Sequence, residues 1–162
     1  MFYSDEHYFG FLGKHENIND IIKADIIKAN VTKPEKAAFI LQDMIDIIEA
    51  KIKQGFTYEG EECDYSPWEW IYIEKYKLYM RREEWWSGES ECPMCELKLN
   101  NKIDGIYSIS RILNGDINSV FNKKIQIKIH TLTPHLIKYH RFYGGYNGNF
   151  RCDPEQLAKV IF

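Results

Sequence analysis

Two cysteines and two histidines constrain the fold of this 162-residue chain more than any other feature. Cys92 and Cys95 are separated by two residues, and Pro93 stiffens the turn between them. His135 and His140 follow much later, five positions apart. Two thiolates and two imidazoles form a donor set that suits a tetrahedral Zn²⁺ ion. A shared ion would hold together two segments with 39 residues between Cys95 and His135.

The spacing of the histidines leaves part of this ligand set open. Five positions on an ideal helix turn the second side chain away by about 140°. His140 is therefore expected to come from a distorted last turn or from just beyond the helix, and Gly144–Gly145 favours an early end. His130 or Cys152 could take the place of a histidine. The other interpretations of Cys92 and Cys95 are buried thiols or a redox pair, although no thioredoxin-like strand and helix surround them.

The sequence also predicts where such a chain works. No stretch of about 18 apolar residues is present, so we expect no membrane-spanning helix. The first residues lack the basic and apolar regions of a secretory signal, which favours a cytoplasmic protein. In that reducing compartment, the four cysteines are expected to be ligands or buried thiols. Abundant Ile, Lys and Asn suggest an AT-rich genome, such as that of a phage or a low-GC bacterium.

Hydrophobic spacing and capping residues predict an α+β fold that is mostly helical, with a small β component around a zinc knuckle. We expect two parts within one compact unit: a helical, acidic and aromatic-rich part over 1–88, and a basic zinc-knuckle part over 89–162. Strands are expected at 97–99 and 124–129. The expected helices are 17–30, 34–54, 66–86, a weaker one at 107–121, 133–140 and 154–162.

The expected helix at 66–86 is unusual because aromatic side chains fall on more than one face. Trp68, Tyr72, Tyr76 and Tyr79 form one stripe at helical spacing. A helix that is apolar nearly all round is either central in the core or presents one face to a partner. The core is the simpler interpretation, but Trp and Tyr are also residues that interfaces favour.

The last third of the chain is basic, although the whole chain carries a net charge of −3. Between Arg111 and Arg151 there are seven Lys or Arg residues and a single acid, Asp116. This asymmetry favours contact with a nucleic acid or an acidic protein, although a solvated face balanced by the acidic part explains it as well. The candidate partner-binding residues are Lys123, Lys124, Lys128, Lys138, Arg141, Tyr143, Tyr146 and Arg151.

The sequence lacks the usual signatures of catalysis. There is no His-Glu-x2-His, no phosphate-binding Gly-x4-Gly-Lys-Ser/Thr and no Gly-x-Ser-x-Gly. We therefore expect a non-enzymatic, regulatory binding protein with structural zinc, which suits a phage or mobile element. One alternative is a protein inhibitor, for example an anti-defence protein, or an adaptor, acting through the 66–86 helix. Another is a zinc-dependent nuclease built on His130, His135 and His140.

Overall fold

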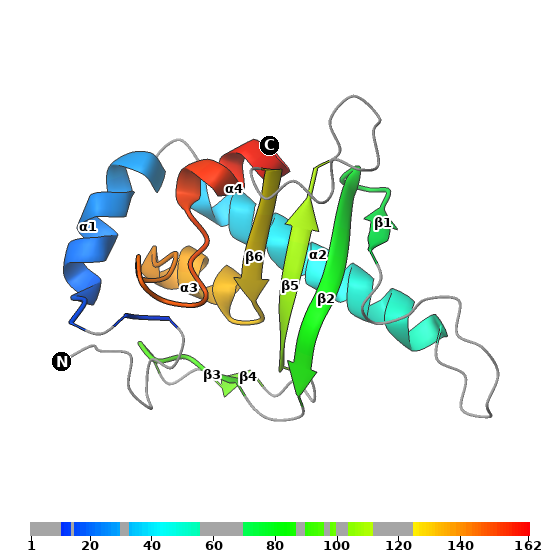
Figure 1. Ribbon diagram of the computed structural model, residues 1–162, viewed down its shortest axis with the longest axis horizontal. Helices are drawn as coiled ribbons and strands as arrows, with labels where there is room; N and C mark the ends of the chain where they lie inside the picture. Colours follow the sequence, from blue (N-terminus) through cyan, green and yellow to red (C-terminus); the bar gives the residue numbers. More distant parts are fainter. Residues whose placement is uncertain are drawn as a thin grey trace.

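The computed structural model describes eight stretches of the chain, which form four helices and six strands (Figure 1). The stretches are residues 11–13, 15–29, 33–55, 70–86, 90–95, 98–99, 104–111 and 125–162. The helices are α1 (Ile18–Ala29), α2 (Pro34–Gly55), α3 (Thr133–His140) and α4 (Pro154–Ile161). The strands are β1 (Ile71–Ile73), β2 (Leu78–Trp86), β3 (Ser90–Glu91), β4 (Lys98–Leu99), β5 (Asp104–Ser110) and β6 (Gln126–His130).

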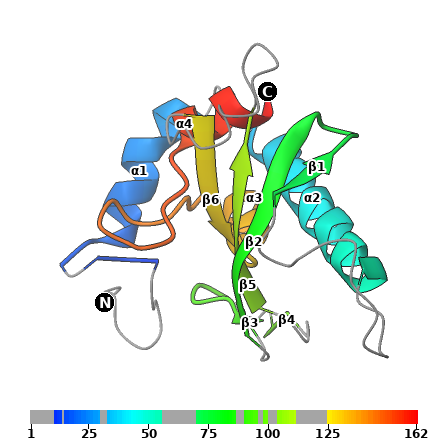
Figure 2. The same cartoon turned by 45° about the vertical axis from the view of Figure 1, so that its right-hand side comes forward.

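A four-stranded sheet and the long helix α2 form the larger part of the described fold. The strands are antiparallel and lie in the order β1-β2-β5-β6. Figures 1 and 2 show α2 running across one face of this sheet. Met80 pairs with Ile109, which pairs with Ile127 on the next strand. These side chains share one buried cluster with Met44 and Ile48 of α2, so the first core is a sheet–helix layer.

A second, smaller buried cluster joins the turn at 11–13, α1, α3 and the segment after α3. Its members come from distant parts of the chain and include Ile18, Leu136, Phe142 and Cys92. Backbone contacts reinforce it, since the N–H of Gly145 donates to the carbonyl of Phe11. The cysteine turn therefore borders on this second cluster, of which Cys92 is a member.

The helix expected over 66–86 is wrong where the structure describes the segment. Residues 71–73 and 78–86 are the antiparallel strands β1 and β2, with Ile73 opposite Leu78. Ile71, Ile73, Leu78 and Met80 are buried while Tyr72 is exposed, which is the two-residue period of a strand. Lys77 adopts a left-handed conformation (φ 55°) in the intervening turn. The proposed cap at 66–67 lies outside the described residues.

Most other helix predictions are confirmed. The side chain of Asn17 accepts hydrogen bonds from the N–H groups of Asn19 and Asp20, as expected of the residue that caps α1. Asp153 caps α4 in the same way, through Glu155 and Gln156. The predicted helices at 34–54 and 133–140 correspond to α2 and α3. Thr32, three residues before Glu35, is the cap that the sequence predicts for α2, and it lies outside the described residues.

The expected α+β class is confirmed, but a mostly helical fold is not supported, because a four-stranded antiparallel sheet makes up a large part of the described chain. The start of the weak helix expected at 107–121 is part of β5, which ends at Ser110, and residues 112–121 lie outside the described residues. The strand expected at 124–129 is β6. A short ribbon of β3 and β4 flanks the cysteine turn. None of the helices in the described stretches is both long enough and apolar enough to cross a membrane.

Candidate metal centre

The two segments that carry the cysteines and the histidines meet in the fold. The sulfur atoms of Cys92 and Cys95 and one ring nitrogen each of His135 and His140 all lie within 4.8 Å of one another. Cys92 Sγ is 3.5 Å from His140 Nε2, and Cys95 Sγ is 3.3 Å from His135 Nε2. The cysteines lie in the turn after β3, and the histidines lie at the two ends of α3. These four residues, here called the Cys/His cluster, are close enough to hold a metal ion.

The separations within the Cys/His cluster fit the size of a zinc site. Zinc binds sulfur at about 2.3 Å and imidazole nitrogen at about 2.0–2.1 Å, so tetrahedral donors lie about 3.3–3.8 Å apart. The two sulfur–nitrogen distances of 3.3 and 3.5 Å agree with this spacing. Every other pair lies within 4.8 Å, so small side-chain adjustments would close the set around one ion. The donor chemistry and the geometry are therefore both compatible with zinc.

The end of α3 explains how histidines five positions apart can converge. The helix ends at His140, and Arg141 follows in a left-handed conformation with φ 52° and ψ 32°. The Arg141 guanidinium donates to the carbonyls of Ile137 and Lys138 at this end of the helix, where the backbone N–H of Arg141 also donates to Ile137. The ring centroids of His135 and His140 are then 5.1 Å apart, and the two rings meet edge to face. Arg141, in its left-handed conformation, therefore ends the helix, whereas from the sequence the Gly144–Gly145 pair was the expected cause of this early end.

Burial shapes the chemistry of the four donors. Cys92 is only 3% exposed, and burial raises the pKa of its thiol to about 11. The backbone N–H of Met94 lies 3.3 Å from the same sulfur and favours the thiolate. Burial lowers the pKa of His135 and of His140, so both rings are neutral at pH 7, the form that binds metal. A bound cation would reverse the shift at Cys92, because coordination favours the thiolate.

The two substitute ligands lie away from the Cys/His cluster. His130 is buried at the end of β6, where its Nδ1 accepts a hydrogen bond from the N–H of Leu132. Its ring packs against those of Phe11 and Phe150, which also contact each other. Cys152 is buried in the sheet–α2 core. Neither is among the four residues whose donor atoms converge in the described part of the chain.

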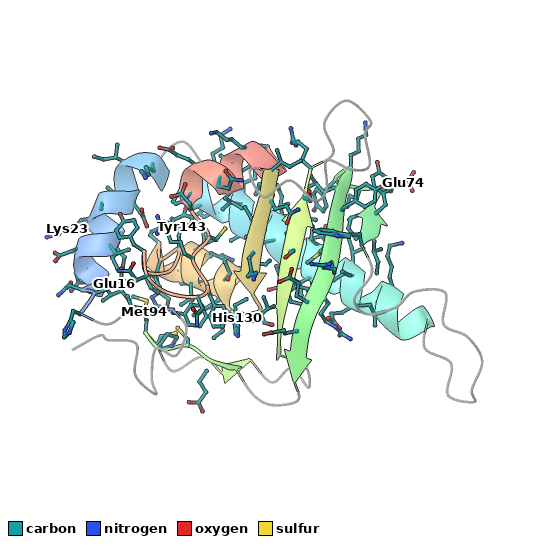
Figure 3. All side chains as sticks on the ribbon, viewed as in Figure 1. Glu16, Lys23, Glu74, Met94, His130 and Tyr143 are labelled. Atoms are coloured by element: carbon teal, nitrogen blue, oxygen red, sulfur yellow. The ribbon has the colours of Figure 1, made fainter. Side chains whose placement is uncertain are left out.

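Most of the described residues that were predicted to bind a partner are engaged within the protein. Tyr143 is fully buried in the first core, so the prediction that it contacts a partner is wrong. Figure 3 shows it within the body of the protein. Arg151 pairs with the buried Asp25 and with Asp153, and its guanidinium lies over the ring of Tyr146. These groups fix the C-terminal segment to α1.

The remaining basic candidates are divided between ion pairs and one groove. Lys128 pairs with Glu83 at 3.3 Å, and Arg141 lies 3.4 Å from Glu35. Lys138 is exposed, and its ammonium lies over the ring of Tyr139. Lys123 and Lys124 lie outside the described residues.

A groove of about 670 Å³ opens beside the Cys/His cluster, between α2 and α3. Phe39 of α2 is 66% exposed and Tyr139 of α3 is 63% exposed, and both line it. Sequence reasoning missed Phe39 because it treated the helix as core. The available signal was that Phe39 falls outside the buried stripe of Ala37, Leu41 and Met44. The groove is lined by Glu35, Ala38, Phe39, Gln42, Cys95, Pro134, His135, Lys138, Tyr139 and His140.

Comparisons of the chain with protein-family models, with curated proteins and with solved structures find no match. The functional argument therefore depends on the geometry of the Cys/His cluster and of the groove beside it.

Proposed function

We propose that this chain is a non-enzymatic binding protein stabilised by one structural zinc ion, held by Cys92, Cys95, His135 and His140. The convergence of these four donors from two distant segments is the observation that carries the proposal. The ion would connect the turn after β3 to α3, across the edge of the second buried cluster. The wall of the groove between α2 and α3 includes three of the ligands, so the same ion would fix the shape of that groove.

A structural role is favoured over a catalytic one by the number of donors. Structural zinc sites have four protein ligands, whereas catalytic sites keep one position open for water or substrate. Four side chains converge here. The nuclease alternative also needs His130, whose ring nitrogen already accepts a backbone hydrogen bond. No observation favours cleavage of a nucleic acid.

The chemistry of the groove favours an acidic segment of another protein as the binding partner. Two exposed aromatic side chains, Phe39 and Tyr139, offer the large contact areas on which protein interfaces depend. Lys138 also lines the groove and makes no ion pair with another described residue, so its charge is available to a carboxylate. Glu35, the acid of the groove, is close to Arg141. Nucleic acid is the less favoured partner, because the described arginines are mostly engaged within the protein.

The inhibitor or adaptor alternative depended on an aromatic helix over 66–86. The described part of that segment is a strand pair in which Ile71, Leu78 and Met80 belong to the core. A helical contact surface is therefore not available there. A protein partner that binds in the α2–α3 groove would also make a protein–protein contact, but at a different place on the surface.

Metal analysis tests the zinc proposal. The protein purified with zinc in the medium is expected to hold one equivalent of zinc after dialysis, and Cys92→Ser should lose it and melt at a lower temperature. The matched control is Cys63→Ser, which removes a thiol that the proposal does not use. Retention of zinc by Cys92→Ser, or an unchanged melting temperature, would contradict the proposed ligand set.

Fluorescence anisotropy tests the partner, with two labelled probes. One is an acidic peptide with interspersed leucines, and the other is a single-stranded oligonucleotide of mixed sequence. We expect the peptide to bind, with binding weakened by Phe39→Ala, by Tyr139→Ala and by added salt. Stronger binding of the oligonucleotide, insensitive to Phe39→Ala, would replace the acidic protein with a nucleic acid. No binding of either probe would contradict the groove as a partner site.

A further inference from the structure

The two cysteines of the Cys/His cluster differ in their access to solvent. Cys92 is buried, and its sulfur also receives the backbone N–H of Met94. Cys95 is exposed and lines the groove between α2 and α3, whereas Cys92 does not. Figure 3 shows Met94, which lies between the two cysteines, close to α3. A reagent that enters the groove therefore meets Cys95 first.

We propose that Cys95 is a modification site at which a hydroperoxide oxidises the thiolate, and that Cys92 completes the oxidation, releases the metal and opens the contact between the cysteine turn and α3. This inference rests on the proposed zinc site. It adds a reactive position and a class of reagent to a site whose role is otherwise structural.

The chemistry is a two-electron oxidation that both thiolates share. The Cys95 sulfur attacks one oxygen of the peroxide, the O–O bond breaks, and the other oxygen leaves as water after taking up a proton. Cys95 then carries a sulfenic acid, which no longer binds zinc as a thiolate. The Cys92 thiolate attacks the Cys95 sulfur, an S–S bond forms, and the hydroxide that leaves is protonated to a second water. Two thiolates, one hydrogen peroxide and two protons thus give one disulfide and two waters.

The position of the two sulfur atoms supports this order of events. They lie within 4.8 Å of each other in a single turn, so the resolving thiolate needs no long-range motion. A disulfide requires a sulfur separation of about 2.05 Å, which draws both sulfurs together and out of the tetrahedral set. Bridges in such short turns are strained, and strained or exposed bridges are readily reduced. The modification is therefore expected to be reversible.

Loss of the two thiolates would change the surface as well as the metal content. His135 and His140 would keep only half of the ligand set, which is too little to retain zinc. The turn carrying Cys92 would lose its metal-mediated connection to α3, while Cys92 and Met94 would still pack in the second cluster. Because Cys95, His135 and His140 all line the groove, oxidation would alter the site proposed for the acidic partner.

Two measurements on the zinc-loaded full-length protein test this inference. The first is brief labelling with iodoacetamide followed by peptide mass spectrometry. Cys95 is expected to be labelled at least about tenfold faster than Cys92, in line with its exposure. The second is addition of hydrogen peroxide in the presence of a chromogenic zinc chelator. We expect release of one zinc per chain, formation of a Cys92–Cys95 disulfide, and recovery of zinc binding after reduction.

The controls separate this inference from the zinc proposal. Cys63→Ser should release zinc at the wild-type rate, because its thiol takes no part. Equal labelling of Cys92 and Cys95, or peroxide oxidation that leaves zinc bound, would overturn the modification site while leaving the structural zinc intact. A disulfide formed with Cys63 or Cys152 instead would overturn it as well. Failure of the untreated protein to hold zinc would overturn the proposed function and this inference together.

Discussion

The sheet–α2 region and the Cys/His region are held together by different kinds of interaction. Between the sheet and α2, long apolar side chains form a continuous layer, and a buried polar group completes it. The Arg82 guanidinium donates to both carboxylate oxygens of Glu49, and the Tyr107 hydroxyl donates to one of them. The Glu49 carboxylate contributes to raising the pKa of Tyr107, after burial as the larger cause, so Tyr107 remains a proton donor. The opposite charges of Arg82 and Glu49 are therefore paired within this region.

The Cys/His region has a smaller core and concentrates four donor groups at its edge. Two of these are thiols, which make weak hydrogen bonds when protonated. Without a cation, the contacts of Cys92 with His140 and of Cys95 with His135 contribute little to stability. The comparison teaches that the sheet–α2 region pairs its buried charges internally, whereas the Cys/His region would be completed by the ion that we propose there. The following predictions test that difference, from the largest expected effect to the smallest.

Removal of zinc with a chelator should produce the largest effect, and the effect should be local. Structural zinc contributes several kcal/mol or more to folding, and we expect a loss of about 5 kcal/mol here. Hydrogen exchange should show lost protection in α3 and around the cysteine turn, while α2 and β5 stay protected. Uniform loss of protection across both regions would contradict the difference between them.

Breaking the buried ion pair should damage the other region instead. Glu49→Leu leaves the buried Arg82 charge without its carboxylate, which should cost about 3–4 kcal/mol in urea-induced unfolding. The double variant Glu49→Leu with Arg82→Leu should recover much of that loss, because no unpaired charge remains. Both variants should hold a full equivalent of zinc. Loss of zinc from either variant would show that the two regions depend on each other.

Removal of a helix cap should have a smaller effect on the sheet–α2 region, onto which α4 packs. Asp153→Ala deletes the carboxylate that accepts from the N–H groups of Glu155 and Gln156, so we expect a loss of about 1 kcal/mol. Thermal melting of the zinc-loaded protein measures it. Asp153→Asn is the matched control, since asparagine also caps helices, and should be closer to wild type. Equal losses in the two variants would assign the effect to the contact with Arg151 instead.

The smallest expected effect is a pH dependence at the junction of α2 with the β1–β2 turn. The Lys75 ammonium and the Tyr76 hydroxyl lower the pKa of Asp43 below its usual value. A lowered carboxylate pKa stabilises the fold above the unfolded-state pKa, and this contribution disappears as the pH falls through the folded-state pKa. Asp43→Asn should therefore be slightly less stable than wild type at neutral pH, with the difference vanishing at strongly acidic pH. An unchanging difference from neutral to acidic pH would contradict this.

The helices and the donor set could be predicted from the sequence because their signals are local. Asn17 and Asp153 are recognisable caps, and the buried stripe of α2 follows helical spacing. The Cys-x2-Cys turn is recognisable as a candidate metal-binding motif from its residue types and spacing alone. The five-residue offset left the second histidine in doubt, because the sequence does not reveal that a left-handed Arg141 ends α3.

Strand β6 was predictable from its alternation, but β1, β2 and β5 were not, because their signals are hidden. The turn between β1 and β2 contains Tyr76 and Lys77 rather than glycine, asparagine or proline, so nothing marks a hairpin. The aromatic residues of that segment also match helical spacing by coincidence. In β5, residues 105–110 are buried on both faces, which removes the alternation by which a strand is recognised. Phe39 falls outside the buried stripe of α2, but only the tertiary packing shows that its exposed side chain lines a groove with α3.

X-ray absorption at the zinc edge tests the central claim most directly, because it reports the donor atoms of the bound ion. The account predicts one zinc per chain with two sulfur neighbours at about 2.3 Å and two nitrogen neighbours at about 2.0 Å. A first shell of three sulfurs, a shell dominated by oxygen, or a protein that holds no zinc would contradict the assignment of Cys92, Cys95, His135 and His140 as its ligands.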